Sequence, residues 1–550
     1  MRSDQWHKNA IVYCLDVDTF RDSNGDGHGD FCGLTESLDY LAGLGVTCIW
    51  LLPFYPTPDC DNGYDITDYY GVDPRLGTLG DFVIFLREAG ERGIRVLIDL
   101  VVNHTSDQHP WFQEARRDKE SPYRDFYIWR TDEPENTSDK VVFPGQEDSI
   151  WDFDPEAEAY YLHRFYKHQP DLNIGNPRVR HEICKIMGFW LQLGVSGFRM
   201  DAAPFIIEHL GTPQEGQAPA YKYLEEFRDF LSWRAGDAIL LAEANVEPEI
   251  MLEYFGDGDR MHMMFNFLAN QFLFLSLVRH NPKPLVQTLR KLPELPDRAQ
   301  WGMFARNHDE LDLGRLSERE RQEVFAEFGP KKEMQLYERG IRRRLAPMLK
   351  GDRDWQALVY SLVFTLPGTP VLWYGEELGM GDDLDLNERD SVRTPMPWSP
   401  HENGGFSNAH PAKVVRPVVS GGKLGYEKIN VEKQQSDPRS LLNVIERMIR
   451  TRKECPEFGW GKWRILPAKP DTVLAHASEW RGGVVLAIHN FARKSAKVEI
   501  QLRSLKPEIL TNLLDEKQYD LPGNGLLKLN LEPFARRWFR LRNRAAEGTL

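Results

Sequence analysis

Short runs of apolar residues alternate with longer amphipathic stretches along most of the chain. Several of the runs, such as "VTCIWLLP", are apolar at nearly every position, which is typical of parallel strands buried on both faces. The longer stretches carry apolar residues at helical spacing, as where Phe82, Phe85 and Ala89 share one face. Thr78 is the predicted N-cap of that helix. The predicted strands are 10–17, 46–53, 94–103, 196–202, 238–244, 261–267, 301–309 and 370–377.

This alternation of strand and helix predicts an α/β fold, a (β/α)8 TIM barrel. Two segments depart from it. The connection between the third and fourth strands is long, polar and aromatic, and it predicts an inserted subdomain over the barrel mouth. The runs "TVLAHAS", "GVVLAIHNFA" and "AKVEIQL" predict a C-terminal antiparallel β-sandwich. The predicted organisation is a barrel over 1–104 and 173–455, an insert over 105–172 and a C-terminal domain over 456–550.

Composition narrows the classes of function. The net charge is −15, which argues against nucleic acid as the main partner because phosphate backbones attract Lys and Arg. We find no run of about 18 apolar residues and expect no membrane span. The start of the chain lacks the basic and then apolar layout of a secretory signal. The six cysteines form no CxxC pair, and we expect buried free thiols in a cytoplasmic protein. Oligomeric state stays open.

Polar residues mark the C-terminal ends of the predicted strands, where barrels of this kind carry their catalytic groups. Carboxylates at three different strand ends would converge on one pocket. Retaining glycosidic chemistry needs such a set: one ionised carboxylate attacks the anomeric carbon, and a second, protonated one supplies a proton to the leaving oxygen. The strand-end residues are Asp99, Asn103, His104, Arg199, Asp201, Glu243, Asn307, His308 and Asp309.

Four motifs carry a family resemblance. "DLVVNH" (99–104), "GFRMDA" (197–202), "LLAEAN" (240–245) and "ARNHDE" (305–310) resemble, in order, the four signature regions of the α-amylase family, family 13 of the glycoside hydrolases. "QPDLN" and "GTPVLWYGEELGM" resemble two further regions, so the likeness covers nearly the whole chain. The alternative, that these acids are only core ion pairs, does not explain six motifs in order.

The resemblance implies roles for single residues. It makes Asp201 the nucleophile, Glu243 the general acid/base and Asp309 the acid that stabilises the transition state. It also implies that the sugar is held by His104, Arg199 and His308.

"NGYDITDY" (62–69) adds two sugar contacts by the same resemblance. Tyr64 is expected to be the aromatic platform under the sugar. Asp65 is expected to pair with Arg393 and to close the far end of the pocket, which would restrict the enzyme to short sugars. A loop aromatic with a surface ion pair is the alternative.

"DSNGDGHGD" has the oxygen-ligand spacing of a calcium loop, with glycines for tight turns. The helices that flank an EF-hand are missing, so we expect a structural Ca²⁺, or Mg²⁺, rather than a sensor. A polar turn without a metal is the alternative. The expected ligands are Asp22, Asn24, Asp26, the backbone oxygen of His28, and Asp30.

The resemblance implies a second cation site between the insert and the barrel, and no organic cofactor. Its implied ligands are Asn103, Asp171, the backbone oxygens of Phe205 and Ile206, and Glu208.

Within the family, "NHDEL" (307–311) and "VRTPMPW" (392–398) resemble members that interconvert maltose and trehalose inside a closed pocket. The segment "YCLDVDTF" (13–20) differs from the sequence that these members usually have there. Two alternatives therefore stay open. One is a hydrolytic α-glucosidase or α-amylase acting on short α-glucosides, and the other is a non-catalytic barrel that serves as a binding subunit.

Overall fold

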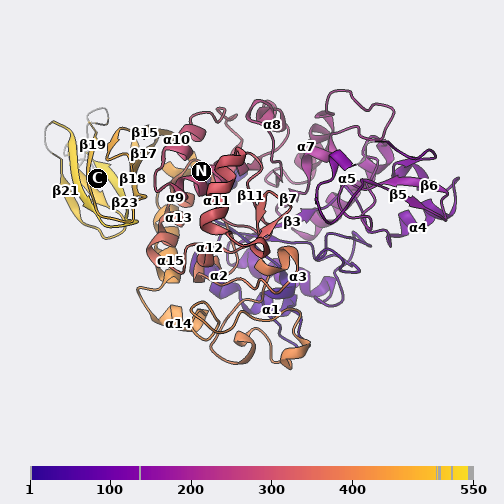
Figure 1. Cartoon of the computed structure of the whole chain (residues 1–550), viewed down its shortest axis with the longest axis horizontal. Coiled ribbons are helices and arrows are strands. Elements are labelled where there is room, and N and C mark those ends of the chain that lie inside the picture. Colours follow the sequence, from indigo (N-terminus) through magenta and orange to yellow (C-terminus); the bar gives the residue numbers. More distant parts are fainter. Residues whose placement is uncertain (1–2, 136–137, 503–504, 506–508, 522–523, 543–550) are drawn as a thin grey trace.

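The computed structural model describes residues 3–135, 138–502, 505, 509–521 and 524–542. The outer limits of the predicted organisation, residues 1 and 550, lie outside these ranges. Figure 1 shows the barrel in the middle of the molecule, with the C-terminal sheets at one end and the segment before α5 (Pro177–Leu193) at the other.

Eight parallel strands close into a barrel in the order β1-β14-β10-β9-β8-β7-β3-β2. They fall within or next to the eight predicted segments, so the (β/α)8 prediction is confirmed. Nearly every strand residue is buried, as the continuous apolar runs require. The strands are β1 (Val12–Leu15), β2 (Cys48–Leu51), β3 (Arg95–Leu100), β7 (Gly197–Met200), β8 (Ile239–Ala242), β9 (Met263–Phe265), β10 (Gln300–Phe304) and β14 (Thr369–Trp373).

Helices cover the outside of the barrel, and α3 (Leu79–Glu91) illustrates how the sequence specifies them. Thr78 and Asp81 form a capping box, which satisfies backbone N–H groups at the start of the helix. Phe82, Phe85 and Ala89 are buried, as predicted. Other outer helices are α7 (Lys222–Arg234), α9 (Phe267–Val278), α13 (Arg353–Thr365) and α15 (Leu441–Lys453).

The long connection after β3 carries α4 (Pro110–Arg117) and a small antiparallel sheet in the order β4-β6-β5. The strands are β4 (Trp129–Arg130), β5 (Trp151–Asp154) and β6 (Ala159–Leu162). Ile150, Trp151 and Leu162 form a separate small core with Leu210. The insert therefore has packing of its own and lies to one side of the barrel (Figure 1).

Two antiparallel sheets form the C-terminal region, which confirms the predicted sandwich. One sheet has the order β15-β17-β18-β23-β20-β21 and the other has β16-β19-β22. Ile488 of the first sheet and Val498 of the second belong to one shared core. The strands are β15 (Lys462–Leu466), β16 (Ala468–Lys469), β17 (Val473–Trp480), β18 (Gly483–Asn490), β19 (Ala496–Gln501), β20 (Ile509–Asn512), β21 (Gln518–Asp520), β22 (Leu526–Leu531) and β23 (Arg536–Arg542).

Within the described residues, no helix is long and apolar enough to cross a membrane. All six cysteines are free thiols. Four are buried as expected, but Cys32 and Cys60 are exposed. Cys32 is the second residue of a short helix and Cys60 lies in the loop after β2, so neither belongs to an apolar run.

Candidate active site

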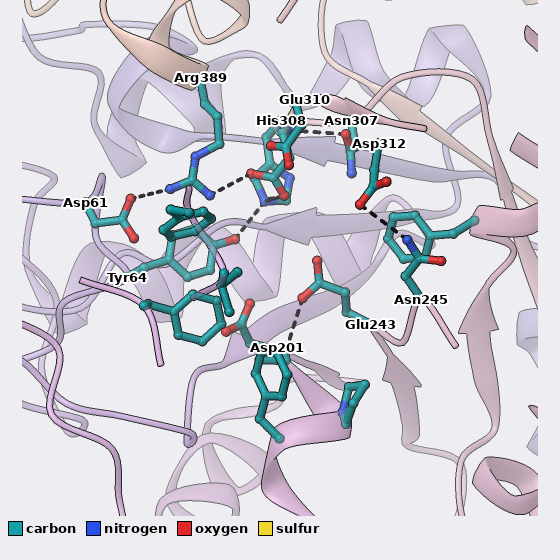
Figure 2. Close-up of a pocket in the computed structure, with 18 of the residues that line it drawn as sticks. Asp61, Tyr64, Asp201, Glu243, Asn245, Asn307, His308, Glu310, Asp312 and Arg389 are labelled. Atoms are coloured by element: carbon teal, nitrogen blue, oxygen red, sulfur yellow. Dashed lines mark hydrogen bonds and ion pairs between the residues drawn. The ribbon is translucent and has the colours of Figure 1, made fainter. Parts of the chain in front are cut away.

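Three carboxylates meet at the C-terminal end of the barrel. Asp201 follows β7, Glu243 follows β8 and Asp309 follows β10. All three line a pocket of about 420 Å³. Figure 2 shows Asp201 and Glu243 facing each other across the pocket floor. The predicted trio is therefore brought together by the fold.

Arg199 places one positive charge among three carboxylates. Its side chain is only 1% exposed. Nη1 lies 2.5 Å from Asp201 Oδ1 and 2.9 Å from Asp99 Oδ1. Nη2 lies 2.9 Å from Glu243 Oε2. One guanidinium cannot neutralise three carboxylates, so a proton is readily held among them.

The two central acids differ in their proton affinity. Burial raises the pKa of Asp201 to about 6, although Arg199 opposes the shift. Burial raises the pKa of Glu243 to about 7, again against Arg199, and the negative charge of Asp201 adds to the rise. Near neutral pH, Asp201 is thus more readily ionised than Glu243, and the shared proton lies on Glu243 or on Asp99, whose pKa burial also raises to about 7.

Asp309 has a strongly positive environment. Its Oδ1 accepts from Arg393 Nη2 at 3.0 Å and from Arg389 Nη1 at 3.2 Å. Burial alone would raise the pKa of Asp309. Contact with His308, Arg389 and Arg393 outweighs burial and holds the pKa of this carboxyl group well below its usual range. Asp309 therefore stays charged, as an acid that stabilises a cationic transition state must.

Tyr64 and His308 form one wall of the pocket. Their rings stack with centroids 5.9 Å apart, and the Tyr64 hydroxyl lies 2.9 Å from His308 Nε2. His104 Nε2 donates to the backbone oxygen of Tyr64 at 3.0 Å. Burial lowers the pKa of His104 to about 4, so it is neutral at pH 7. Tyr64, His104 and His308, three of the predicted sugar contacts, therefore lie together at the pocket.

The predicted pairing of Asp65 with Arg393 is wrong. Asp65 is fully buried and accepts the backbone N–H groups of Cys60 and Asp61 at 2.9 and 3.1 Å. Its carboxylate holds the loop together and does not line the pocket. Arg393 instead donates to the backbone oxygen of His308 at 2.8 Å as well as to Asp309.

Asp61 and Arg389 form an acid–arginine pair in the pocket that sequence reasoning missed. Arg389 Nη2 lies 2.7 Å from Asp61 Oδ1, and the same guanidinium contacts Asp309 (Figure 2). Gln169 also donates to Asp61, at 2.9 Å. The sequence "DNGYD" contains two carboxylates, Asp61 and Asp65, and either could have been predicted to bind the sugar. Only the loop conformation decides which of them faces the sugar.

Contacts between the insert and later segments lie beside the pocket, which Val142, Phe143 and Arg339 line. Phe143 stacks on Tyr337 with ring centroids 4.6 Å apart. Arg339 Nη2 donates to the backbone oxygen of Val142 at 3.0 Å. The hydroxyl of Tyr337 donates to Glu388 at 3.0 Å. These residues were not predicted. Further lining residues are Phe165, Asn245, Phe267, Glu310 and Asp312.

Residues 22–30 form a tight loop whose predicted ligands bind its own backbone. Asp22 Oδ1 accepts the N–H of Asn24 at 3.0 Å, and Asn24 in turn accepts that of Asp26 at 2.8 Å. Asp26 accepts the N–H of His28 at 2.8 Å, and Asp30 accepts that of Gly33. In the part of the chain that the structure describes, these acids do not bring three carboxylate ligand atoms within 4.8 Å. A calcium ion here would also need amide and backbone oxygens, and it stays a prediction.

Arg164 lies at the second predicted cation site. Asn103 Nδ2 donates to Asp171 at 3.1 Å. Arg164 joins the two acids, with Nη2 2.5 Å from Glu208 and its backbone N–H 3.0 Å from Asp171. Its guanidinium also lies over the ring of Phe205. A cation ligated by both carboxylates and by the oxygens of Phe205 and Ile206 would require Arg164 to move, and this site also stays a prediction.

Comparison with known proteins agrees with the geometry. Residues 15–328 and 341–461 match the family model described as alpha amylase, catalytic domain. Residues 482–540 match a model described as sucrose hydrolase-like, C-terminal domain.

Two curated relatives are similar to this chain to different degrees. The chain is 42% identical over 550 residues to the trehalose synthase/amylase of Mycolicibacterium smegmatis, covering 98% of this chain and 93% of that protein. It is 32% identical over 604 residues to the oligo-1,6-glucosidase of Parageobacillus thermoglucosidasius, covering 98% and 99%.

Among solved structures, the trehalulose synthase of Pseudomonas mesoacidophila superposes with a TM-score of 0.76 at 27% identity, covering 98% of this chain and 99% of that one. The shared barrel, the matched catalytic-domain model and the trio at the strand ends agree. The chain belongs to the α-amylase family.

Proposed function

We propose that this enzyme interconverts maltose and trehalose by transferring one glucosyl unit within a closed pocket. The observation that carries the proposal is the convergence of Asp201, Glu243 and Asp309 on one pocket that the insert borders. The relative named trehalose synthase/amylase is also more similar than the relative named oligo-1,6-glucosidase, at 42% against 32% identity.

The first half-reaction breaks the α-1,4 bond of maltose. The carboxylate of Asp201 attacks the anomeric carbon of the non-reducing glucose, and Glu243 gives its proton to the leaving O4. The products are a glucosyl ester on Asp201, with inverted configuration, and a free glucose. Asp309, held ionised by Arg389 and Arg393, stabilises the positive charge that develops on the sugar ring.

The second half-reaction forms the α,α-1,1 bond. The retained glucose turns so that its anomeric hydroxyl faces the ester. Glu243, now ionised, removes the hydroxyl proton, and the oxygen attacks the anomeric carbon as Asp201 leaves. Two inversions give retention, and Asp201 and Glu243 return to their starting protonation states.

Covering of the pocket decides between isomerisation and hydrolysis. Water in place of the turned glucose would release two glucose molecules. The contacts of Phe143, Tyr337 and Arg339 beside the pocket support slow escape of glucose and slow entry of water. A hydrolytic α-glucosidase with the same trio is the second candidate, because the family also contains such enzymes.

Products formed from maltose test the proposal. We expect trehalose as the main new sugar and glucose as a minor one. Glucose alone would favour the hydrolase, and an unchanged sugar pool would favour a binding subunit. The chemistry uses only carboxylates and protons and needs no organic cofactor. We infer a reducing, cytoplasmic location from the six free cysteines.

A further inference from the structure

A cysteine, an aspartate and a histidine meet next to the pocket and take no part in the proposed reaction. One ligand atom from each of Cys60, Asp65 and His168 lies within 4.8 Å of the others. Cys60 and Asp65 belong to the loop between β2 and α3, and His168 belongs to the segment between β6 and α5. The cluster therefore joins two segments that are distant in sequence.

The three residues are held in place by contacts to the fold. Asp65 is fully buried and is fixed by the backbone N–H groups of its own loop. The ring of His168 stacks on Tyr166 with an interplanar angle of 7°. The backbone oxygen of His168 accepts the N–H of Asp107 at 2.8 Å.

One polar atom at the cluster lacks a partner. His168 Nε2 is buried and has no hydrogen-bond partner, which is costly for a ring nitrogen unless something binds it. Cys60 is exposed, so an ion in solution can reach the cluster from that side.

The charge around the thiol favours a cation. The carboxylates of Asp65, Asp107 and Asp59 lie near the Cys60 thiol. Their negative charges attract a positive ion to that position. A metal bound there would replace the proton.

We propose that Cys60, Asp65 and His168 bind a divalent cation of the zinc class, with water as the fourth ligand. Sulfur, imidazole nitrogen and carboxylate oxygen are the ligands that Zn²⁺ takes at bond lengths of about 2.0–2.3 Å. Tetrahedral ligands at these lengths lie about 3.3–3.8 Å apart, so the three atoms need to close by no more than about 1.5 Å. Binding forms a Zn–S bond and releases the thiol proton to solvent.

Two ligands of the proposed metal site are next in the chain to residues that are in contact with the substrate pocket. Cys60 precedes Asp61, and His168 precedes Gln169, whose side chain donates to Asp61 at 2.9 Å. Asp61 contacts Arg389 in the pocket. A metal that joins Cys60 to His168 would thus fix the two segments that carry the Asp61–Gln169 contact.

Titration with zinc alone tests the site. The full-length enzyme, stripped with chelator and saturated with Ca²⁺ to fill oxygen-ligand sites, is titrated with ZnCl₂ in two buffers of different protonation enthalpy. We expect one Zn²⁺ per chain with release of a proton. Replacement by Co²⁺ should give a thiolate-to-cobalt charge-transfer absorption band.

Three variants locate the binding. Cys60→Ser and His168→Gln should each weaken zinc binding by at least about tenfold. Cys32→Ser removes the other exposed thiol and should bind zinc as the wild type does. Zinc binding that survives Cys60→Ser, or no uptake by the wild type, would overturn the proposal. If a variant fails to fold, the cobalt spectrum of the wild type decides, and a missing thiolate band overturns the site.

Discussion

Arg199 contacts Asp201, Glu243 and Asp99 with a single guanidinium group, and Asp201 and Glu243 are the proposed nucleophile and acid/base. If Asp201 is the nucleophile, Asp201→Asn leaves the fold intact but removes the attacking charge. We expect kcat for maltose to fall by at least about a thousandfold, or about 4 kcal/mol of barrier. Steady-state rates with thermal unfolding as the folding control measure this. Near-normal turnover would reject the assignment.

The pKa values of Asp201 and Glu243 predict the pH dependence. Asp201 must be charged to attack, so kcat/KM falls as the pH drops through about 6. Glu243 must be protonated to assist departure, so kcat/KM falls as the pH rises through about 7. We expect a narrow bell-shaped profile. In Glu243→Gln the alkaline limb should vanish, and the rate loss should be much smaller with α-glucosyl fluoride, whose leaving group needs no proton. A persisting alkaline limb in this variant contradicts the role of Glu243.

Two neighbouring aspartates should differ in function. Asp61→Asn removes the charge that pairs with Arg389 but keeps an acceptor for Gln169, and it should raise KM for maltose about tenfold or more, with little change in stability. Asp65→Ala leaves buried loop N–H groups without an acceptor and should destabilise the fold by about 1–3 kcal/mol. Kinetics and denaturant unfolding of the pair separate these effects. A higher KM for the Asp65 variant and a lower stability for the Asp61 variant would instead support Asp65 as the residue that binds the sugar.

At the scale of elements, the insert contacts later segments beside the pocket through a small number of aromatic and polar contacts. Tyr337→Ala removes the ring that stacks on Phe143 and the hydroxyl that reaches Glu388. We expect the share of glucose among the products of maltose to rise severalfold, because water then enters. Tyr337→Phe keeps the ring and is the matched control. An unchanged product ratio in Tyr337→Ala would show that this contact does not seal the pocket.

The loop at 22–30 predicts a response to calcium. A cation at about one hundred times its Kd would stabilise the fold by about 2.7 kcal/mol. Calcium should raise the melting temperature, chelator should reverse the rise, and Asp26→Ala should remove the response. If calcium does not change the melting temperature of the wild-type protein, the loop is a polar turn without a metal.

Sequence patterns predicted the regular elements well for a physical reason. Parallel barrel strands are buried on both faces, so each leaves a continuous apolar run with catalytic residues at its end. Loops carry no such periodicity. Asp61 and Asp65 look alike in sequence, and only in the folded loop do the Thr57 hydroxyl and the backbone N–H groups of Cys60 and Asp61 turn Asp65 inward. The contact of Phe143 with Tyr337 joins residues far apart in the chain, which no local pattern predicts.

At the scale of the whole molecule, the two additions to the barrel lie at opposite ends (Figure 1). The insert reaches the pocket mouth. The C-terminal sandwich packs against α13, where Ser361 Oγ lies 2.8 Å from both His489 Nε2 and Trp538 Nε1. We therefore infer that the insert controls access to the pocket and that the sandwich supports the barrel.

The central claim is that one glucose leaves maltose, turns and returns without escaping. Conversion of unlabelled maltose in the presence of ¹³C-labelled free glucose tests it most directly, with mass spectrometry of the trehalose formed. Intramolecular transfer predicts trehalose that is almost free of label while the labelled glucose stays in the pool. Trehalose labelled in proportion to the free glucose would contradict the closed-pocket account.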